Sequence, residues 1–388
     1  MAVTTVERGG GATIALAGMA ALAVPMGIGR FALTPILPMM QLDAGLSIAD
    51  GGWLASANYA GTLLGAVCAA LVPVPAAPAV RGGLLAIGLT TLAMAVTGGL
   101  LVWIVLRAIA GFATAWVLVF GSAWSLARLT ASRRPVLNSA VFAGYGVGIV
   151  GAGLVGIVLT RAHASSASAW AVLGVLALVV TGLIWPFFEG EGGVVGEAAP
   201  RAASWWDVDS MRLVVCYGAF GFGYIVPATF LPVMARSVVD DPAVLGWSWP
   251  VFGAAAAVST FAVSAIAGSV DNRRLWSAGH VILAAGVVLP VIRPGVGATI
   301  ASALLVGAMF TVITMAGFSE ARAVRGAAAR GLIGALATAF AVGQIVALVG
   351  VSVAVRAGGG FDGALVVSGV LLAASAALLL IGERSGSA

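Results

Sequence analysis

The chain has 388 residues, of which 61% are hydrophobic and only 9% are charged, and its net charge is +5. A soluble domain carries roughly 25% charged residues, so this composition excludes an ordinary soluble protein and predicts a chain surrounded by lipid. All the basic residues are arginines and none of them forms a polybasic run, so the positive charge does not indicate a nucleic-acid partner.

Apolar runs separated by charged residues, proline or glycine predict helices that cross the membrane, because one crossing needs about 20 apolar residues. The weakest boundary lies between the third and fourth runs, where Thr97-Gly98-Gly99 is the break. We predict an all-α integral membrane protein of twelve transmembrane helices. In chain order the expected spans are 12–40, 51–72, 82–99, 100–127, 136–160, 168–188, 211–235, 246–268, 274–292, 296–319, 331–355 and 363–381.

The arginines are distributed unequally over the two sides of these spans. Thirteen of the 19 fall on the side of the N-terminus, four on the other side, and Arg30 and Arg107 lie inside the membrane. Because cytoplasmic loops are enriched in arginine, both termini are expected in the cytoplasm of a bacterium, with the chain in the inner (plasma) membrane. The polar stretch 189–210 is expected to be a cytoplasmic linker between an N-terminal six-helix bundle, 1–188, and a C-terminal one, 211–388.

The two halves of the sequence match at an offset near 194 residues. Six spans per half give both halves the same direction, the parallel repeat of transporters that bind substrate between two bundles near the midplane. Chance similarity between glycine- and alanine-rich helices is the alternative. The matching positions are Gly27-Ile28-Gly29 with Gly221-Phe222-Gly223, Leu37-Pro38 with Leu231-Pro232, Gly52-Trp53 with Gly246-Trp247, and Gly148 with Gly343.

Arg30 lies deep in the first span, in the segment Gly27-Ile-Gly-Arg-Phe-Ala-Leu-Thr-Pro-Ile-Leu-Pro38. A charge at the bilayer centre costs about 2.5–3.5 kcal/mol on insertion scales, so such residues usually face a cavity or a partner. We expect Arg30 to face a cavity and either to meet an anionic group or to lock the helix. The alternative is an arginine that extends to the outer interface.

Other polar side chains inside the spans are candidates for a substrate or coupling site. Arg107 in the fourth span either faces the cavity or bonds to backbone carbonyls as a structural residue. Each of the remaining candidates is equally well explained by hydrogen bonds between helices, although Tyr224 occupies the repeat position of Arg30. They are Asn58, Tyr59, Asn138, Tyr145, Tyr224 and Gln344.

Two motifs resemble those of the major facilitator superfamily. Arg107-x-x-x-Gly-x-Ala-Thr-Ala is similar to its helix 4 motif, whose arginine is associated with proton coupling in many members. The segment Gly268-Ser-Val-Asp271-Asn-Arg273-Arg274 resembles its cytoplasmic loop motif, which implies a conformational latch made by Asp271, Arg273 and Arg274. The corresponding first-half loop keeps Arg81 but lacks the acid.

A third motif narrows the resemblance. The segment Gly27–Gln41 resembles the opening of the YbfB/YjiJ branch of this superfamily, in which Gly-x-Gly-Arg-Phe-x-x-x-Pro-x-Leu-Pro recurs. The resemblance implies the superfamily fold. It does not identify a substrate.

We therefore predict a secondary transporter that moves a small solute by alternating access. Two arginines within the spans and no carboxylate at mid-membrane favour an organic anion, whereas proton coupling is implied by the resemblance. We expect a monomer that needs no cofactor or metal. Efflux of hydrophobic, drug-like compounds and a non-transporting sensor of the same fold are the alternatives, whereas an enzyme lacks a nucleophile paired with a base.

Overall fold

The computed structural model describes residues 10–72, 74–129, 135–188, 194–195, 207–235, 246–266, 269–326 and 329–381. Ten helical segments in these ranges are long and apolar enough to cross a membrane. The helices are α1 (Gly11–Ala23), the π-helix η1 (Val24–Arg30), α2 (Leu33–Asp43), α3 (Ile48–Leu71), α4 (Ala76–Val96), α5 (Leu100–Leu129), α6 (Pro135–Arg161), α7 (Ser166–Ile184), the short 3-10 helix η3 (Trp185–Phe187), α8 (Val208–Ala235), α10 (Ser248–Ile266), α11 (Asn272–Ile292), α12 (Val296–Arg325), α13 (Ala329–Arg356) and α14 (Asp362–Leu380).

Helix ends follow local sequence signals. Ser47 and Asp50 form a reciprocal capping box at the start of α3, and Ser165 caps α7. The chain between α4 and α5 turns at Gly99, whose φ of 94° suits a residue without a side chain. Asp207 accepts a hydrogen bond from the Ser210 amide at 2.7 Å and starts α8 at Val208, three residues before the expected boundary at 211.

Two short strands depart from the expected all-α fold. Val74–Pro75 (β1) pairs antiparallel with Val194–Val195 (β2), so the loop between α3 and α4 is joined to the segment after α7. Most of the expected linker, 189–210, lies outside the described residues.

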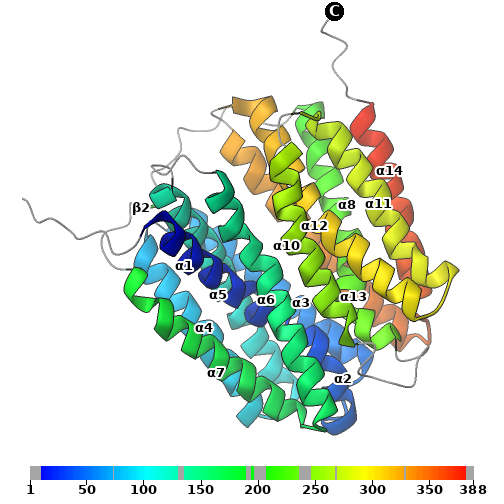
Figure 1. Cartoon of the computed structure of the whole chain (residues 1–388). Coiled ribbons are helices and arrows are strands. Elements are labelled where there is room, and N and C mark those ends of the chain that lie inside the picture. Colours follow the sequence, from blue (N-terminus) through cyan, green and yellow to red (C-terminus); the bar gives the residue numbers. More distant parts are fainter. Residues whose placement is uncertain are drawn as a thin grey trace, which may run out of the picture.

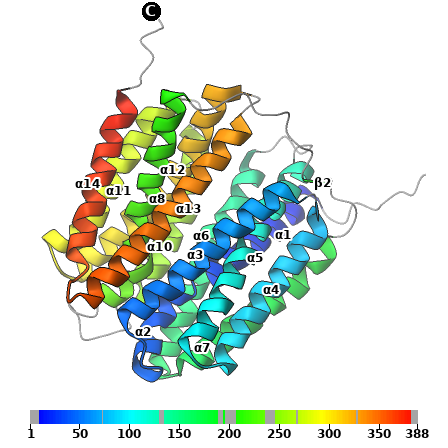
Figure 2. The ribbon, with the colours of Figure 1, turned by 180° about the vertical axis from the view of Figure 1, so that it is seen from behind.

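The helices form two groups that stand side by side (Figures 1 and 2). The first group contains α1 to α7 and the second contains α8 to α14. Inside the first group α3 and α4 pack on α5, and inside the second α8 packs on α13 and α11 on α12. Two pairs of helices make the main contacts between the groups, α6 with α10 and α3 with α13, and α2 also contacts α8.

The molecule has two distinct ends. We call the end where α1 begins and α14 finishes the terminal face, and the end where α2 finishes and α3 begins the opposite face. The ribbons of the two groups approach each other toward the opposite face and spread apart toward the terminal face (Figures 1 and 2). Contacts between the groups are therefore concentrated from the middle of the helices to the opposite face.

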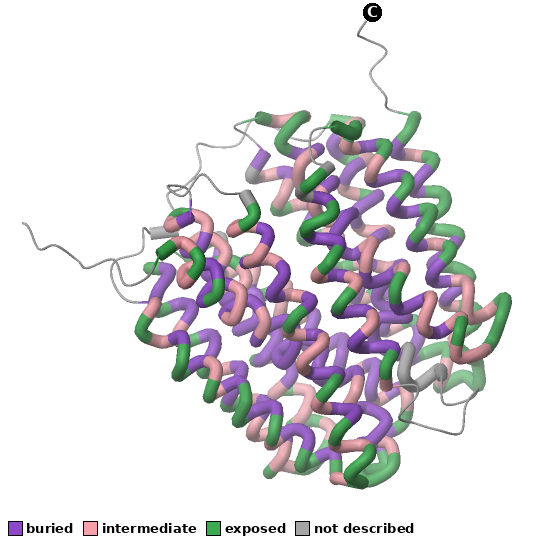
Figure 3. Tube along the Cα trace, viewed as in Figure 1, coloured by how far each residue is buried: buried purple, intermediate pink, exposed green. Residues whose placement is uncertain are grey.

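Burial follows the membrane pattern. Buried residues gather between the helices and exposed ones lie on the outer surface (Figure 3). That outer surface is apolar, as shown by Val158 at 63% exposure, Leu183 at 70% and Val370 at 62%. Exposed apolar side chains on helices of this length identify a multi-pass membrane protein, because lipid is the solvent that accepts them.

Candidate functional site between the two helix groups

A π-helix interrupts the first membrane segment at the Gly-x-Gly-Arg motif. In this segment the Phe31 amide donates to the Met26 carbonyl at 3.2 Å, five residues back. Pro25 has no N–H to donate, and Gly27 packs so closely on the Gly148 carbonyl that no side chain fits there. Both features disturb a regular α-helix, and short π segments of this kind occur frequently at functional sites.

Side chains from α3 and α5 bond to the carbonyls of this segment. Asn58 donates through Nδ2 to the Gly29 carbonyl and to the Arg107 carbonyl, both at 3.0 Å. Arg107 donates through Nη2 to the Arg30 carbonyl at 2.8 Å. Buried carbonyls need such partners. Asn58 and Arg107 therefore hold the backbone on which the Arg30 side chain is mounted.

The Arg30 side chain crosses from the first group to the second. Its Nη2 donates to the Gln344 Oε1 at 2.9 Å and to the Tyr224 hydroxyl at 3.3 Å, while the Gln344 Nε2 donates to the same hydroxyl at 2.6 Å. The guanidinium carbon lies 4.5 Å from the centre of the Tyr59 ring, a cation–π distance. We call Arg30, Tyr59, Tyr224 and Gln344 the Arg30 cluster.

Sequence reasoning named each member of this cluster, but it did not pair them. The partners that the structure gives Arg30 are neutral, so the expected anionic partner is not among them. Arg30 is 9% exposed, and its Nε has no hydrogen-bond partner within the described part of the chain. The side chain does not extend to an interface, because its bonds lie at the junction of the two groups.

The cluster lies where the two repeats meet. Arg30 and Tyr224 are 194 residues apart, and Thr34 donates to the Ala228 carbonyl at 3.2 Å across the same separation. Residues at matching repeat positions contact each other where a two-fold axis passes between them. The pseudo-two-fold axis of the repeat therefore runs beside Arg30 and Thr34.

The two seams between the groups obey the same symmetry. Gly52 in α3 packs against Ser352 in α13, and Gly246, just before α10, packs against Ile157 in α6. Gly52 and Gly246 are matching repeat positions, and so are Ile157 and Ser352. Each seam is therefore a copy of the other about the axis beside the Arg30 cluster.

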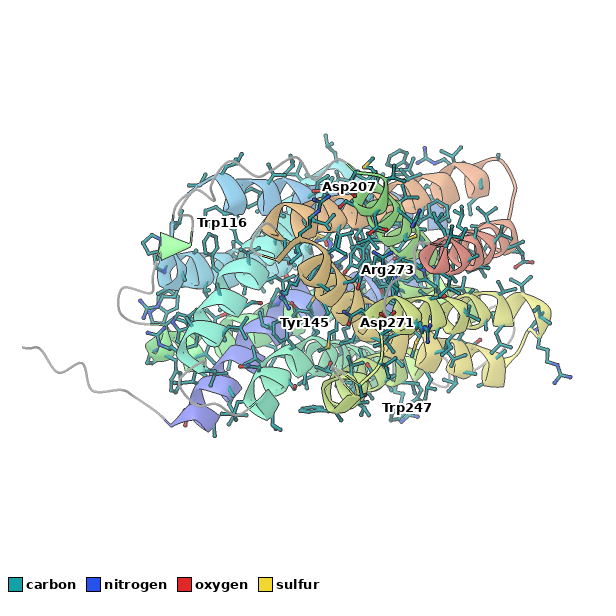
Figure 4. All side chains as sticks on the ribbon, turned by 90° about the horizontal axis from the view of Figure 1, so that it is seen from above. Trp116, Tyr145, Asp207, Trp247, Asp271 and Arg273 are labelled. Carbon is teal, nitrogen blue, oxygen red and sulfur yellow. The ribbon has the colours of Figure 1, made fainter. Side chains whose placement is uncertain are left out.

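Aromatic rings surround the cluster. Tyr145 in α6 is within electrostatic reach of Arg30, and Tyr217 in α8 contacts Phe340 with ring centroids 5.5 Å apart. The Tyr224 ring stacks on Phe340 with centroids 5.4 Å apart. Seen from the terminal face, Tyr145 lies near the middle of the molecule (Figure 4).

Arg107 points to different neighbours. It is 1% exposed, and its guanidinium carbon lies 5.6 Å from the centre of the Trp170 ring in α7. Trp170 also lines a separate cavity of about 240 Å³ near the opposite face, together with Met40 and Trp103. Arg107 and Arg30 are thus linked through one backbone carbonyl, and the Arg107 Nε and Nη1 have no hydrogen-bond partner among the described residues. This geometry matches the structural alternative for Arg107.

The expected latch residues lie at the terminal face of the second group (Figure 4). Asp271 caps α11 by accepting from the amides of Arg273 and Arg274, so the expected latch acid is a helix cap. Arg273 bonds instead to both oxygens of Asp209, at 2.9 and 2.5 Å, and to Glu320 at 2.5 Å. Asp209 was missed by sequence reasoning, although an acid in the first turn of α8 was a usable signal.

Arg325 adds a further pair to this network. It donates to the Ser210 hydroxyl at 2.8 Å and pairs with Asp207. The network joins α8, α11 and α12, all of the second group. As for metals, the described residues contain no group of three or more His, Cys, Asp or Glu side chains that could hold an ion.

Comparison with known proteins supplies the family. The model of a family described as uncharacterised MFS-type transporter YbfB matches residues 22–380. A crystal structure of a mutant of the nucleoside transporter NupG has a TM-score of 0.69 and 14% sequence identity, covering 96% of this chain and 100% of that chain. At this identity the likeness shows the fold. A search of curated proteins finds no match to the sequence.

Proposed function

Because the chain belongs to the YbfB-type family of major facilitator superfamily transporters, we propose that it moves a small organic anion across the membrane by alternating access. The observation that carries this proposal is the bonding of Arg30 to Tyr224 and Gln344 across the junction of the two groups. A guanidinium offers a carboxylate paired, charge-assisted hydrogen bonds. At this position such a ligand would contact both groups at once.

The proposal includes the architecture that alternating access requires. We propose twelve transmembrane helices in a monomer, with α3 and α10 added to the ten qualifying segments. The bundles are 1–188 and 211–388, joined by the cytoplasmic linker 189–210. The distribution of the arginines supports a cytoplasmic location of both termini in a bacterial inner membrane.

In this orientation the terminal face is cytoplasmic and the structure is an inward-facing state. Contacts toward the outer side support this assignment. Asp50 pairs with Arg356 at 3.3 Å, and Phe31 packs on Trp249 with ring centroids 5.3 Å apart. The outward-facing state would need these contacts to part while the ends at the terminal face come together. In that motion Arg273 and its partners keep the ends of α8, α11 and α12 together as one unit.

Transport assays in proteoliposomes test the proposal. Uptake of radiolabelled benzoate, lactate, succinate, uridine, glucose and a hydrophobic cation would be compared for the wild type, Arg30→Gln and Arg161→Gln. Arg161 is an exposed arginine at the end of α6 and serves as the matched control. We expect at least one carboxylate to be carried by the wild type and the control. Its uptake should fall at least about 30-fold in Arg30→Gln, since losing one partner of a buried charged pair costs about 2 kcal/mol or more.

Other outcomes identify the alternatives. Uptake of uridine, glucose or the cation that is unchanged in Arg30→Gln would contradict the anion proposal, and for the cation it would indicate drug-like efflux. Binding of a solute without flux would indicate a sensor. Repeating the carboxylate assay with an imposed pH gradient tests proton coupling, because a coupled carrier accumulates its solute when protons flow inward.

A further inference from the structure

We propose that the transported anion is a flat aromatic monocarboxylate, the chemical class of benzoate and phenylacetate. This inference rests on the proposed function, because it assigns the body and the charge of the anion bound at the Arg30 cluster. It is carried by the aromatic side chains gathered around one guanidinium and by the direction in which the second guanidinium points.

A single negative charge matches the site. Arg30 presents its guanidinium at the junction of the groups, with bonds to Tyr224 and Gln344 of the second group. Arg107 donates through Nη2 to the Arg30 carbonyl, its Nε and Nη1 have no partner among the described residues, and its guanidinium lies over the Trp170 ring of the first group. A dicarboxylate would need a second cation that faces the first. One forked arginine matches one forked carboxylate.

The hydrogen bonds around Arg30 form a preassembled carboxylate site. The Gln344 Oε1 accepts from Arg30 as a carboxylate oxygen would. The Arg30 Nε has no partner in the described structure, so a bidentate ligand would use a donor that is now unsatisfied. The Tyr224 hydroxyl oxygen accepts from both Arg30 and Gln344, so its own proton points away from them. Binding thus replaces a neutral acceptor by a charged one.

The surroundings of this site suit a flat apolar body. Tyr224 stacks on Phe340 at an interplanar angle of 11°, and Tyr217 stacks on Phe318 at 22°. Phe340 and Tyr145 are each partly exposed, so these rings keep surface for a further partner. Aromatic rings prefer stacked or edge-to-face aromatic neighbours, which a benzene ring supplies. A nucleoside or sugar would bury several hydroxyls against rings that offer few acceptors.

Binding measurements on purified wild-type protein in detergent test the class. The probes are benzoate, cyclohexanecarboxylate, benzamide, succinate and uridine. Cyclohexanecarboxylate has the charge of benzoate without its flat ring, and benzamide has the ring without the charge. We expect benzoate to bind tightest and cyclohexanecarboxylate to bind about threefold to tenfold more weakly, the effect of one aromatic contact. Benzamide, succinate and uridine should bind at least about 30-fold more weakly than benzoate.

Two variants test whether the benzoate ring stacks on Phe340 beside the Arg30 cluster. In Phe340→Leu the ratio of benzoate to cyclohexanecarboxylate affinity should fall to about one, because the stacking surface is gone. In Phe261→Leu, which replaces a phenylalanine that is 43% exposed on α10, the ratio should stay at its wild-type value. Both probes are measured on the same preparation, so partial misfolding cancels from the ratio. An unchanged ratio in Phe340→Leu would overturn the assignment.

The outcomes separate this inference from the function on which it rests. Equal affinity for benzoate and cyclohexanecarboxylate, or tighter binding of succinate, overturns the aromatic monocarboxylate while the anion transporter stands. If benzoate does not bind but another carboxylate of the transport panel is carried, the aromatic monocarboxylate is likewise overturned and the anion transporter stands. Benzamide or uridine binding as tightly as benzoate overturns the anion function itself, and this inference fails with it.

Discussion

The first and second groups place different structures at the same repeat position. In the first, Arg30 ends a π-helix, whereas in the second, Tyr224 lies within α8, which runs uninterrupted from Val208 to Ala235. The packing around them is nevertheless shared. Gly27 rests on the Gly148 carbonyl, and its repeat partner Gly221 rests on the Phe340 carbonyl. The repeat thus determines the packing of the helices, whereas the π-helix and the arginine that it carries are found in the first group and not in α8.

The sequence shows why only one copy is distorted. Pro25 in the first group lacks an amide donor, and its repeat position is held by Ala219, which has one. The Asn58 side chain donates to the Gly29 carbonyl. The matching repeat position holds Phe252, whose side chain has no hydrogen-bond donor. The distortion and its support therefore occur together in the first group. A π segment without these partners would leave buried carbonyls unpaired.

The largest effect is expected when that support is removed. Asn58→Leu keeps the side-chain volume but leaves the Gly29 and Arg107 carbonyls without their donor. Because each buried orphan group costs about 1–3 kcal/mol, unfolding free energy should fall by about 2–4 kcal/mol. Unfolding by sodium dodecyl sulfate in mixed micelles measures it.

The matched control is Ser302→Ala in α12, whose buried hydroxyl has no hydrogen-bond partner within the described residues. It should leave stability nearly unchanged. A cost for Asn58→Leu no greater than that of Ser302→Ala would show that the π segment does not depend on Asn58, and the contrast between the two groups would lose its cause.

A somewhat smaller effect tests the symmetric part of the comparison. Gly148 in α6 and Gly343 in α13 each lie against a carbonyl of the neighbouring first helix of their group, Ala23 and Gly218 respectively. An added methyl group at either position must push backbone away, so each change to alanine should cost about 1–3 kcal/mol. The two costs should be similar because the two contacts are repeats of each other.

The chain offers a control glycine in each of these helices. Gly151 in α6 and Gly350 in α13 have open space where a side chain would point. Their replacement by alanine should be neutral or slightly stabilising, since glycine is the poorer helix former. The melting temperatures of the four variants in detergent compare the two closely packed glycines, Gly148 and Gly343, with the two control glycines, Gly151 and Gly350. Equal costs for Gly148→Ala and Gly151→Ala would contradict the close packing of α1 on α6.

Sequence reasoning predicted the positions of the helices well, for a physical reason, although ten of the segments in the described ranges qualify as membrane helices and twelve were expected. A membrane helix forms its backbone hydrogen bonds within itself and faces lipid. Its length and hydrophobicity can therefore be read from the local sequence. The observed helices begin and end within a few residues of most expected bounds. The π-helix was not predicted, although Pro25 and the glycines signalled a weak helix, because the π register depends on donors supplied by α3 and α5.

The members of the Arg30 cluster were each named from the sequence as candidates, but their contacts with one another were not predicted. Gln344 is 314 positions from Arg30, and nothing in the spacing of the two residues reveals their contact. Tyr224 was easier to find, since the repeat places it opposite Arg30. The latch of Asp271, Arg273 and Arg274 stays a prediction, because an acid before two arginines is typical of both an ion pair and a helix N-cap. The structure adds that Asp271 caps α11 and that Arg273 bonds to Asp209, a contact that only the tertiary packing of α8 on α11 reveals.

A moderate effect is expected at the contact between the repeats. Tyr224→Phe removes the hydroxyl that accepts from Arg30 and Gln344 and keeps the ring on Phe340. Stability should fall by about 1 kcal/mol, the usual net value of a buried hydrogen bond. A double-mutant cycle with Gln344→Leu should give a coupling energy of about 0.5–1.5 kcal/mol. Additive losses would show that the two side chains do not act together.

The smallest effect concerns the ion pair at the seam between α3 and α13. Arg356 pairs with Asp50 at 3.3 Å, and the Arg356 side chain is 56% exposed. In the sequence the matching repeat positions hold Arg161 and Val244, so the arginine is repeated and Asp50 is not. Arg356→Gln should cost less than about 1 kcal/mol, because exposed ion pairs contribute little, and the cost should shrink further in 1 M salt, where charges are screened. Arg161→Gln, the repeat-matched control, should cost nothing measurable at either salt concentration. A larger cost for Arg356→Gln that persists in high salt would mean that this pair, and not the packed glycines, holds the α3–α13 seam closed.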